Sequence, residues 1–345
     1  MAENDYKIVG YMADWGAWSA ETTHADRMTH INYAFAHIEH GIVSIGKKNK
    51  LQELYRLKQK FPGIKTLISI GGWGAEGFSD AALTAGARDK LGESIMLFIK
   101  KYGFDGADLD WEYPGISEAG ITARPEDRHN FTLLLEDIRE KLNRQGEQDG
   151  KNYLLTIASG ARQQHLSSLE LDAVSSIVDF VNLMAYDFHS GLSKFAGHHA
   201  NLYTSLCDDG DRMSADLAVR SCINAGVPAN KLVLGCAFYG RGWTVEEAEN
   251  NGLYEYAGKD RSEHPYSELE SAYIDKNGFT RYWDQSAKAP YLWDGRRFIS
   301  YEDETSLAYK ASYIKSKGLG GVMFWEYTQD KDHILLNRLY SSLLK

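Results

Sequence analysis

The sequence lacks any run of 18 or more apolar residues, so it offers no candidate membrane-spanning helix. It also lacks a block of Lys or Arg, and its formal net charge is −10. Without a basic face, the chain is poorly suited to the phosphates of a nucleic acid or to an anionic membrane surface. We therefore expect no nucleic-acid partner and no membrane partner, and the acidic balance is compatible with an uncharged polymer as substrate.

Cysteine and proline are both scarce. The three cysteines show no CxxC spacing, which indicates neither a zinc site nor a redox motif, and we expect buried free thiols at Cys207, Cys222 and Cys236. The six prolines form no Pro-rich linker, and no internal repeat or low-complexity tract is present. We therefore predict a single domain over residues 1–345, and nothing in the sequence requires more than a monomer.

Histidine provides one superficial metal-site candidate. His198 and His199 are neighbours in the sequence and follow Gly197. Adjacent residues in a loop rarely bind one metal ion without further ligands, so loop polarity is the simpler interpretation. We expect no metal site and no cofactor.

Eight short apolar runs, rich in β-branched and aromatic residues, alternate with amphipathic segments. The runs predict strands at residues 7–12, 29–36, 64–71, 104–111, 153–160, 178–185, 231–238 and 320–325. The amphipathic segments predict helices that include residues 50–61, 88–102, 126–144, 214–225 and 305–317. Eight successive parallel βαβ units close into a barrel, so we predict the α/β class and a (β/α)8 TIM barrel.

The alternation breaks once, after the seventh predicted strand. Residues 244–297 are too long for one helix and are rich in Tyr, Gly and Asp. We predict a small α+β insertion here, on top of the barrel. Within it, residues 272–290 are typical of short strands with turns, and Asn277-Gly278 favours a tight hairpin turn.

The most informative segment is acidic. In a strand over residues 104–111, the side chains of Asp108, Asp110 and Glu112 project from one face, about 6.6 Å apart. In the fourth strand of a barrel that face points inward. Like charges with little water cannot all ionise, so the last carboxyl is pushed towards a raised pKa and a general-acid role. Two alternatives are a Mg²⁺ or Ca²⁺ site and a solvated acidic edge, but Leu109 and Trp111 between the acids indicate a buried strand.

This segment resembles a known family signature. Asp105-Gly106-Ala107-Asp108-Leu109-Asp110-Trp111-Glu112-Tyr113-Pro114 matches the DGxDxDWEYP motif of glycoside hydrolase family 18, which contains chitinases and some endo-β-N-acetylglucosaminidases. Other segments resemble the family in chain order, and these are His30-Ile31-Asn32-Tyr33-Ala34-Phe35, Ser69-Ile70-Gly71-Gly72-Trp73, Met184-Ala185-Tyr186-Asp187, Phe238-Tyr239-Gly240-Arg241-Gly242 and Phe324-Trp325. The resemblance is to bacterial-type chitinases that carry the α+β insertion.

The resemblance implies hydrolysis of β-1,4 bonds between N-acetylglucosamine units with retention, by substrate assistance. The acetamido oxygen of the −1 sugar attacks the anomeric carbon and forms an oxazolinium ion. Glu112 is then the proton donor and later the base, Asp110 binds the acetamide N–H, and Asp108 shares a proton with Asp110. Tyr186 donates its hydroxyl to the acetamide oxygen. Asp105 and Ser69 support the strand rather than contact substrate.

The substrate implied is chitin or a chito-oligosaccharide. Aromatic residues make up 12% of the chain, and pyranose rings pack on aromatic faces. We expect Trp325 beneath the −1 sugar, and further contacts from Tyr11, Phe35, Trp73, Tyr113, Met184, Asp187, Tyr239 and Arg241. Weaker candidates for a cleft wall are Trp283, Asp284 and Trp293.

Two other functions stay open. One is an endo-β-N-acetylglucosaminidase that trims N-glycans, and the insertion argues against it because an insertion deepens the cleft for a linear chain. The other is a non-catalytic chitin-binding protein, which the intact Glu112, Asp110 and Tyr186 argue against. The resemblance also implies an extracellular, secreted protein, although residues 1–5 lack the basic and apolar regions of a signal peptide.

Overall fold

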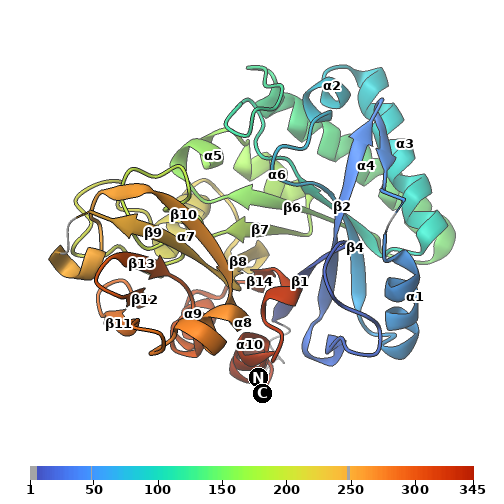
Figure 1. The fold of residues 1–345 in the computed structure, drawn as a ribbon. Coiled ribbons are helices and arrows are strands. Elements are labelled where there is room, and N and C mark those ends of the chain that lie inside the picture. Colours follow the sequence, from blue (N-terminus) through green and yellow to red (C-terminus); the bar gives the residue numbers. More distant parts are fainter. Residues whose placement is uncertain (1–5, 48, 247–248) are drawn as a thin grey trace.

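The computed structural model describes residues 6–47, 49–246 and 249–345, and eight of its parallel strands form a closed barrel (Figure 1). In order around the barrel they are β1 (Lys7–Ala13), β2 (His30–Glu39), β4 (Lys65–Gly71), β5 (Gly106–Asp110), β6 (Leu154–Gly160), β7 (Phe180–Met184), β8 (Leu232–Ala237) and β14 (Gly321–Trp325), and β14 pairs back with β1. Each coincides with one predicted apolar run. The prediction of a (β/α)8 barrel is confirmed.

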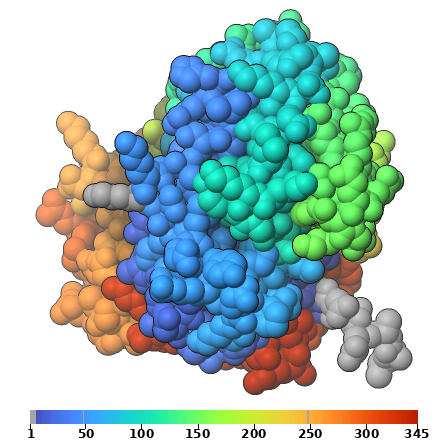
Figure 2. All heavy atoms as spheres, turned by 90° about the vertical axis from the view of Figure 1, so that its right-hand side faces the viewer, coloured from blue at the N-terminus to red at the C-terminus, as the bar shows by residue number. Residues whose placement is uncertain are grey.

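Helices lie on the outside of the barrel (Figure 1). They are α1 (Leu51–Lys60), α2 (Phe78–Ala82), α3 (Ala85–Tyr102), α4 (Asp127–Asp149), α5 (Gln163–Ser167), α6 (Leu171–Ile177), α7 (Ala215–Asn224), α9 (Glu304–Lys317) and α10 (Ile334–Leu343). Local sequence sets their ends. Thr84 caps the start of α3 with a hydroxyl that accepts from the Ala87 N–H, and Gly103, with φ of 71°, caps its end. Figure 2 shows the side of the molecule built by the blue-to-green half of the chain.

A second, antiparallel sheet follows the barrel strand β8 after one residue. Its strands are β9 (Tyr239–Val245), β10 (Ala257–Pro265), β11 (Thr280–Asp284), β12 (Ala289–Trp293) and β13 (Arg297–Ser300), in the order β10-β9-β13-β12-β11. It lies beside the barrel (Figure 1) and has a small core that includes Trp243, Trp293 and Phe298. Residues 247 and 248, inside the predicted insertion, lie outside the described residues.

The hairpin prediction for Asn277-Gly278 is wrong in one respect. Both residues have the positive φ that a tight turn needs, 51° and 88°, but this turn leads into β11 and does not join two strands. The segment before it is helical, with α8 at Tyr266–Glu268 and a π-helical turn at Leu269–Tyr273. The hairpin of β11 and β12 turns at residues 285–288 instead.

The barrel interior packs apolar side chains beneath a polar layer. Val9, Phe180, Val233 and Met323 fill it, so the strand ends above them are held in fixed positions. Cys222 and Cys236 are buried free thiols as expected, whereas Cys207 is free but exposed, because its loop runs over the surface. Within the described residues, no helix has the length and apolar character that crossing a membrane requires.

Candidate active site

A cavity of about 840 Å³ opens where the barrel strands end. Parallel strands point their carboxyl ends at this face, which is where TIM barrels build their sites. Apart from Asp108 and the three weaker cleft-wall candidates, every predicted catalytic or substrate-binding residue lines it: Tyr11, Phe35, Trp73, Asp110, Glu112, Tyr113, Met184, Tyr186, Asp187, Tyr239, Arg241 and Trp325. Their side chains come from β1, β2, β5, β7, β9 and β14 or from the residues directly after a strand. The fold therefore gathers residues that are far apart in the chain.

Asp108 lies fully buried beneath the cavity, in the middle of β5. Its Oδ2 accepts from the hydroxyls of Tyr11 and Ser69, both at 2.7 Å. Its Oδ1 accepts from Thr156 at 2.6 Å and from Asn182 at 3.1 Å. Burial raises the pKa of Asp108, and the four donors oppose that rise. Because these donors all favour the carboxylate, Asp108 anchors the acidic strand to four other barrel strands.

Asp105 lies directly before β5 and does not line the cavity. Its Oδ2 accepts from Lys58 Nζ and from the Thr66 backbone N–H, both at 2.8 Å, at the start of the strand. Asp105 therefore ties the beginning of β5 to β4 and α1, as Ser69 ties its middle. Both contacts fit the supporting roles expected from the sequence.

Asp110 and Glu112 form an acidic pair at the cavity wall. Asp110 is buried, and its Oδ1 has no hydrogen-bond partner among the described residues. Burial, together with the charges of Glu112 and Asp108, raises the pKa of Asp110 well above its ordinary value. Burial likewise raises the pKa of Glu112 to about 7. One carboxyl of this pair therefore holds a proton near neutral pH, as a general acid must.

The residues after β7 supply a phenol and a second carboxylate. Burial, then the charges of Asp110 and Glu112, raise the pKa of Tyr186 well above its ordinary value, so its hydroxyl stays a donor. Asp187 has a positive φ of 56° and is turned towards Arg241. Arg241 donates from Nε at 2.9 Å and from Nη2 at 2.8 Å to its two oxygens. Although burial opposes it, the neighbouring His199 and then Arg241 hold the pKa of Asp187 below its ordinary value.

Aromatic rings form a continuous strip along the cavity. Trp325 stacks on Phe35 with ring centroids 5.5 Å apart and an angle of 18°, and Tyr11 lies 5.8 Å from Trp325. Trp15, not among the predicted site residues, continues the strip 6.4 Å from Phe35 and is 68% exposed. Trp73 is 57% exposed at the rim. Flat apolar faces that remain accessible in a polar cleft suit the C–H faces of sugars.

The cavity wall also contains polar residues that were not predicted from the sequence. The His165 imidazole stacks on Tyr113 at 3.8 Å, and its Nε2 lies 3.0 Å from Glu118 Oε2. Other missed wall residues are His37, Arg162 and Glu263. The signal that could have found Trp15 and His165 is position, since both follow the end of a predicted strand within five residues. Glu118 and Glu263 carry no such signal.

Two sequence expectations near the site are wrong. Trp283, Asp284 and Trp293 do not line the cavity: Trp293 packs in the core of the antiparallel sheet, and Asp284 accepts from Ser205 and Ser286. His198 and His199 do lie in a loop, but loop polarity does not account for them, because the antiparallel sheet covers this loop and both side chains are fully buried. No cluster of three or more metal-ligating side chains occurs in the described part of the chain.

Known proteins resemble this chain along nearly its whole length. The family model described as Glycosyl hydrolases family 18 matches residues 7–330. "Chitinase A1" of Niallia circulans is 39% identical over 99% of the chain, which spans 59% of that protein. "Chitotriosidase-1" of Mus musculus is 34% identical over 92% of the chain and 72% of its own length. A solved family 18 N-acetylglucosaminidase from Paenibacillus barengoltzii superimposes with a TM-score of 0.94 at 46% identity, covering 98% of this chain and 100% of its own.

Proposed function

The chain belongs to the glycosyl hydrolases of family 18, and from this premise we propose that it is a chitinase. It hydrolyses the β-1,4 bond between N-acetylglucosamine units of chitin or a chito-oligosaccharide, with retention of configuration. The observation that carries the proposal is the pair of Asp110 and Glu112 at the cavity wall. Burial raises the pKa of both carboxyls, and Asp110 Oδ1 is buried without a hydrogen-bond partner among the described residues.

Glu112 protonates the glycosidic oxygen and later accepts a proton from the attacking water. Its raised pKa keeps the acid form available near pH 7. Asp110 accepts the acetamide N–H on its free Oδ1, which holds the acetamido oxygen in line with the anomeric carbon. An intramolecular nucleophile held in this way avoids much of the entropic cost of assembly. Asp110 also offsets the positive charge of the oxazolinium ion.

Tyr186 and Asp187 act on the same sugar. The Tyr186 hydroxyl donates to the acetamide oxygen, and its high pKa keeps it a donor throughout the reaction. Asp187, fixed by Arg241, contacts the −1 sugar. Asp108 shares a proton with Asp110 and helps to return Glu112 to its acid form. Asp108 is suited to this role because it lies directly below Asp110 on the same face of β5.

The substrate chain packs along the aromatic strip. Trp325 lies beneath the −1 sugar, and Phe35, Tyr11 and Trp73 extend the contact surface. We assign the antiparallel sheet to the α+β insertion of the bacterial-type enzymes. It deepens one wall, because Arg241 on β9 and Glu263 on β10 both line the cavity.

A second candidate activity is the release of single N-acetylglucosamine units. It is favoured by the 46% identity to the family 18 N-acetylglucosaminidase, over 98% of this chain and 100% of that one. The catalytic residues and the mechanism are the same for both activities. The length of the first products distinguishes the two.

The deciding experiment is hydrolysis of a chitin hexamer by the wild type and by Glu112→Gln, with products separated by length and anomer. Turnover that gives the β-anomer first and is lost in Glu112→Gln supports a retaining enzyme that uses Glu112. The exposed variant Glu140→Gln on α4 serves as the matched control. Products of two or more sugars indicate a chitinase, and single sugars indicate the second activity. A wild type that binds the hexamer without cleaving it contradicts both.

A further inference from the structure

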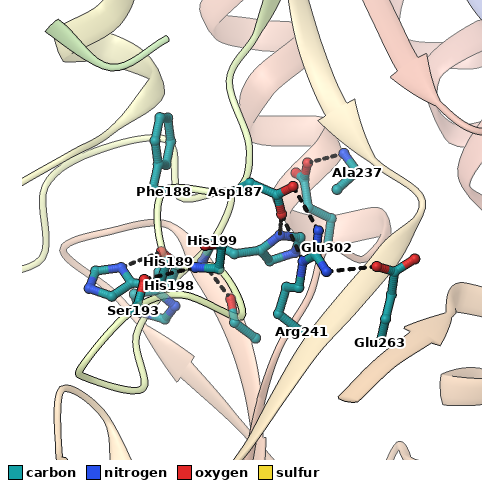
Figure 3. A network of polar contacts seen from close by, with 12 residues as sticks. Asp187, Phe188, His189, Ser193, His198, His199, Ala237, Arg241, Glu263 and Glu302 are labelled. Carbon is teal, nitrogen blue, oxygen red and sulfur yellow. Dashed lines mark hydrogen bonds and ion pairs between the residues drawn. The ribbon is translucent and has the colours of Figure 1, made fainter. Parts of the chain in front are cut away.

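His199 lies in the loop between β7 and α7, and its backbone is fixed from two sides (Figure 3). Its carbonyl accepts from the Phe188 N–H at 3.0 Å, and its own N–H donates to Ser300 Oγ at 2.9 Å. The first contact joins it to the residue directly after Asp187, and the second joins it to the last residue of β13. The His199 side chain is therefore held in one place between the barrel and the antiparallel sheet.

The imidazole of His199 is completely buried against the site. Its Nδ1 lies 3.6 Å from Asp187 Oδ1, and its ring centroid lies 5.2 Å from that of Tyr239. Neither ring nitrogen has a hydrogen-bond partner among the described residues. Buried polar groups are normally paired, and an apolar side chain would fill this space without an unmet donor or acceptor. The polar group that the ring faces is the Asp187 carboxylate.

The charges around His199 determine its state. It lies beside Asp187 after β7 and near Arg241 on β9, and Arg241 in turn pairs with Glu263 (Figure 3). The charge of Lys310, which forms a buried ion pair with Glu302, also acts on the ring. Burial lowers the pKa of His199, and Asp187 only partly opposes this. The ring is therefore neutral at neutral pH and can offer one N–H as a donor.

Asp187 is consequently approached from two directions. Arg241 binds both of its oxygens, and His199 stands beside Oδ1. A bidentate partner fixes the plane of the carboxylate, but Arg241 is itself shared with Glu263 at 2.7 Å. A second, rigidly held side chain beside Oδ1 is therefore placed to hold Asp187 independently of Arg241.

We propose that His199 is a positioning residue for the reaction: it holds the Asp187 carboxylate against Arg241, so that Asp187 meets the −1 sugar in a fixed orientation. This inference rests on the proposed function, in which Asp187 contacts that sugar. His199 itself does not line the cavity and touches no substrate.

The neighbouring residue supplies a matched control. His198 is also completely buried, and its Nε2 lies 3.2 Å from Asp284 Oδ2. It has the same residue type, the same burial and the same kind of partner, but Asp284 does not line the cavity. Loss of His198 therefore reports the structural cost of removing a buried imidazole beside an aspartate, without affecting Asp187.

The test compares His199→Leu, His199→Asn, Asp187→Asn, the double variant His199→Leu with Asp187→Asn, and His198→Leu. Each is measured for thermal stability and for kcat/KM on a chitin hexamer. His199→Leu is expected to lower kcat/KM roughly fivefold to tenfold, because the carboxylate that contacts the −1 sugar is then less firmly oriented. His199→Asn keeps a donor and restores kcat/KM. In the Asp187→Asn background, His199→Leu has almost no further effect, because its partner is already changed.

His198→Leu is expected to lower the melting temperature while kcat/KM is retained. Three results would each overturn the proposal. One is a kcat/KM in the double variant that falls by the product of the two single losses, and another is a His199→Asn variant whose kcat/KM is no higher than that of His199→Leu. The third is a loss of kcat/KM in His198→Leu as large as that in His199→Leu. If His199→Leu does not fold, the test uses His199→Phe in its place, because phenylalanine keeps a flat ring beside Tyr239. If the wild type does not cleave the hexamer, the proposed function fails, and hexamer affinity of the same variants tests the positioning role separately.

Discussion

The Tyr11 hydroxyl on β1 donates a 2.7 Å hydrogen bond to Asp108 Oδ2 on β5, across the barrel and 97 residues along the chain. Burial raises the pKa of Tyr11 well above its ordinary value, and the charge of Asp108 adds to the rise, so the phenol stays a donor. The same ring lines the cavity next to Trp325. One side chain therefore connects the buried acidic strand to the aromatic strip.

Tyr11→Phe removes one of the four donors of Asp108 and is expected to lower the free energy of unfolding by about 1.5–3 kcal/mol, the range for a hydrogen bond to a charged group. It is also expected to lower kcat/KM, because Asp108 loses part of its anchor. Urea unfolding and hexamer kinetics measure the two effects. Tyr55→Phe, on the exposed face of α1, is the control and should be neutral. A neutral Tyr11→Phe would show that the bond is dispensable.

Activity should fall on the alkaline side of neutrality. The acid form of Glu112 is required, and burial raises its pKa to about 7. The plot of kcat/KM against pH for the free enzyme should therefore show a basic limb near pH 7, along which the rate decreases tenfold per pH unit. Asp110 titrates together with Glu112, so the limb belongs to the pair. A rate that stays flat to pH 9 contradicts the assignment of Glu112 as the acid.

The same shift has a consequence for stability. Glu112 has an ordinary pKa of 4.5 in the unfolded chain and about 7 when folded, so between these values the folded state binds more protons. Stability contributed by the protonated form is complete below pH 4.5 and is lost as pH rises through 7. Glu112→Gln does not titrate, so its stability relative to wild type should increase by up to about 3 kcal/mol between pH 4 and pH 8. Urea unfolding at both pH values measures this difference, and a pH-independent difference would contradict it.

The barrel was predictable from the sequence because buried parallel strands are continuous apolar runs. The run at residues 231–238 became β8, Leu232–Ala237, with a shift of one residue at each end. The acidic face was predictable because alternation along a strand is a local rule. Their spacing alone places three side chains on one face of the strand: Asp108, Asp110 and Glu112.

Contacts between distant segments were not predictable in this way. The sequence indicates only a polar loop residue at His199, whereas in the structure the antiparallel sheet covers it. Ser300, whose hydroxyl accepts from the His199 N–H, lies 101 residues further along the chain. His165 reaches the cavity wall because Gly160 has no side chain to exclude it. Such contacts depend on which surfaces of the fold pack together, and neither hydrophobic periodicity nor motif spacing predicts this.

Gly160 leaves room for the stacked rings of Tyr113 and His165. A Cβ at this position would overlap His165 Nδ1 and lie 2.7 Å from Tyr113 Cε1. Gly160→Ala is therefore expected to lower the free energy of unfolding by about 1–3 kcal/mol, as overpacking does, and to lower kcat/KM by displacing Tyr113 beside Glu112. Gly86→Ala on α3 is the control: no atom lies within 4 Å of its Cβ, and it should be neutral or slightly stabilising. Equal effects of the two variants would contradict the packing argument.

Lys310 on α9 and Glu302 form a buried ion pair at 2.7 Å behind the end of β8. Glu302 also accepts from the Ala237 N–H at 3.0 Å, so the pair supports a strand end next to the cavity. Lys310→Met leaves the Glu302 charge buried without its partner and is expected to cost about 3–5 kcal/mol in the free energy of unfolding.

The deficit of Lys310→Met should shrink as pH falls, because protonation removes the unpaired charge of Glu302. The double variant Lys310→Met with Glu302→Gln should recover part of the loss for the same reason. The exposed pair of Arg144 and Glu140 on α4 provides the comparison, since Arg144→Met should cost less than about 1 kcal/mol. Urea unfolding at pH 5 and pH 8 measures all three variants. If Lys310→Met cost no more than Arg144→Met, the strand end would be held by packing alone, and the buried charge pair would be incidental to the site it adjoins.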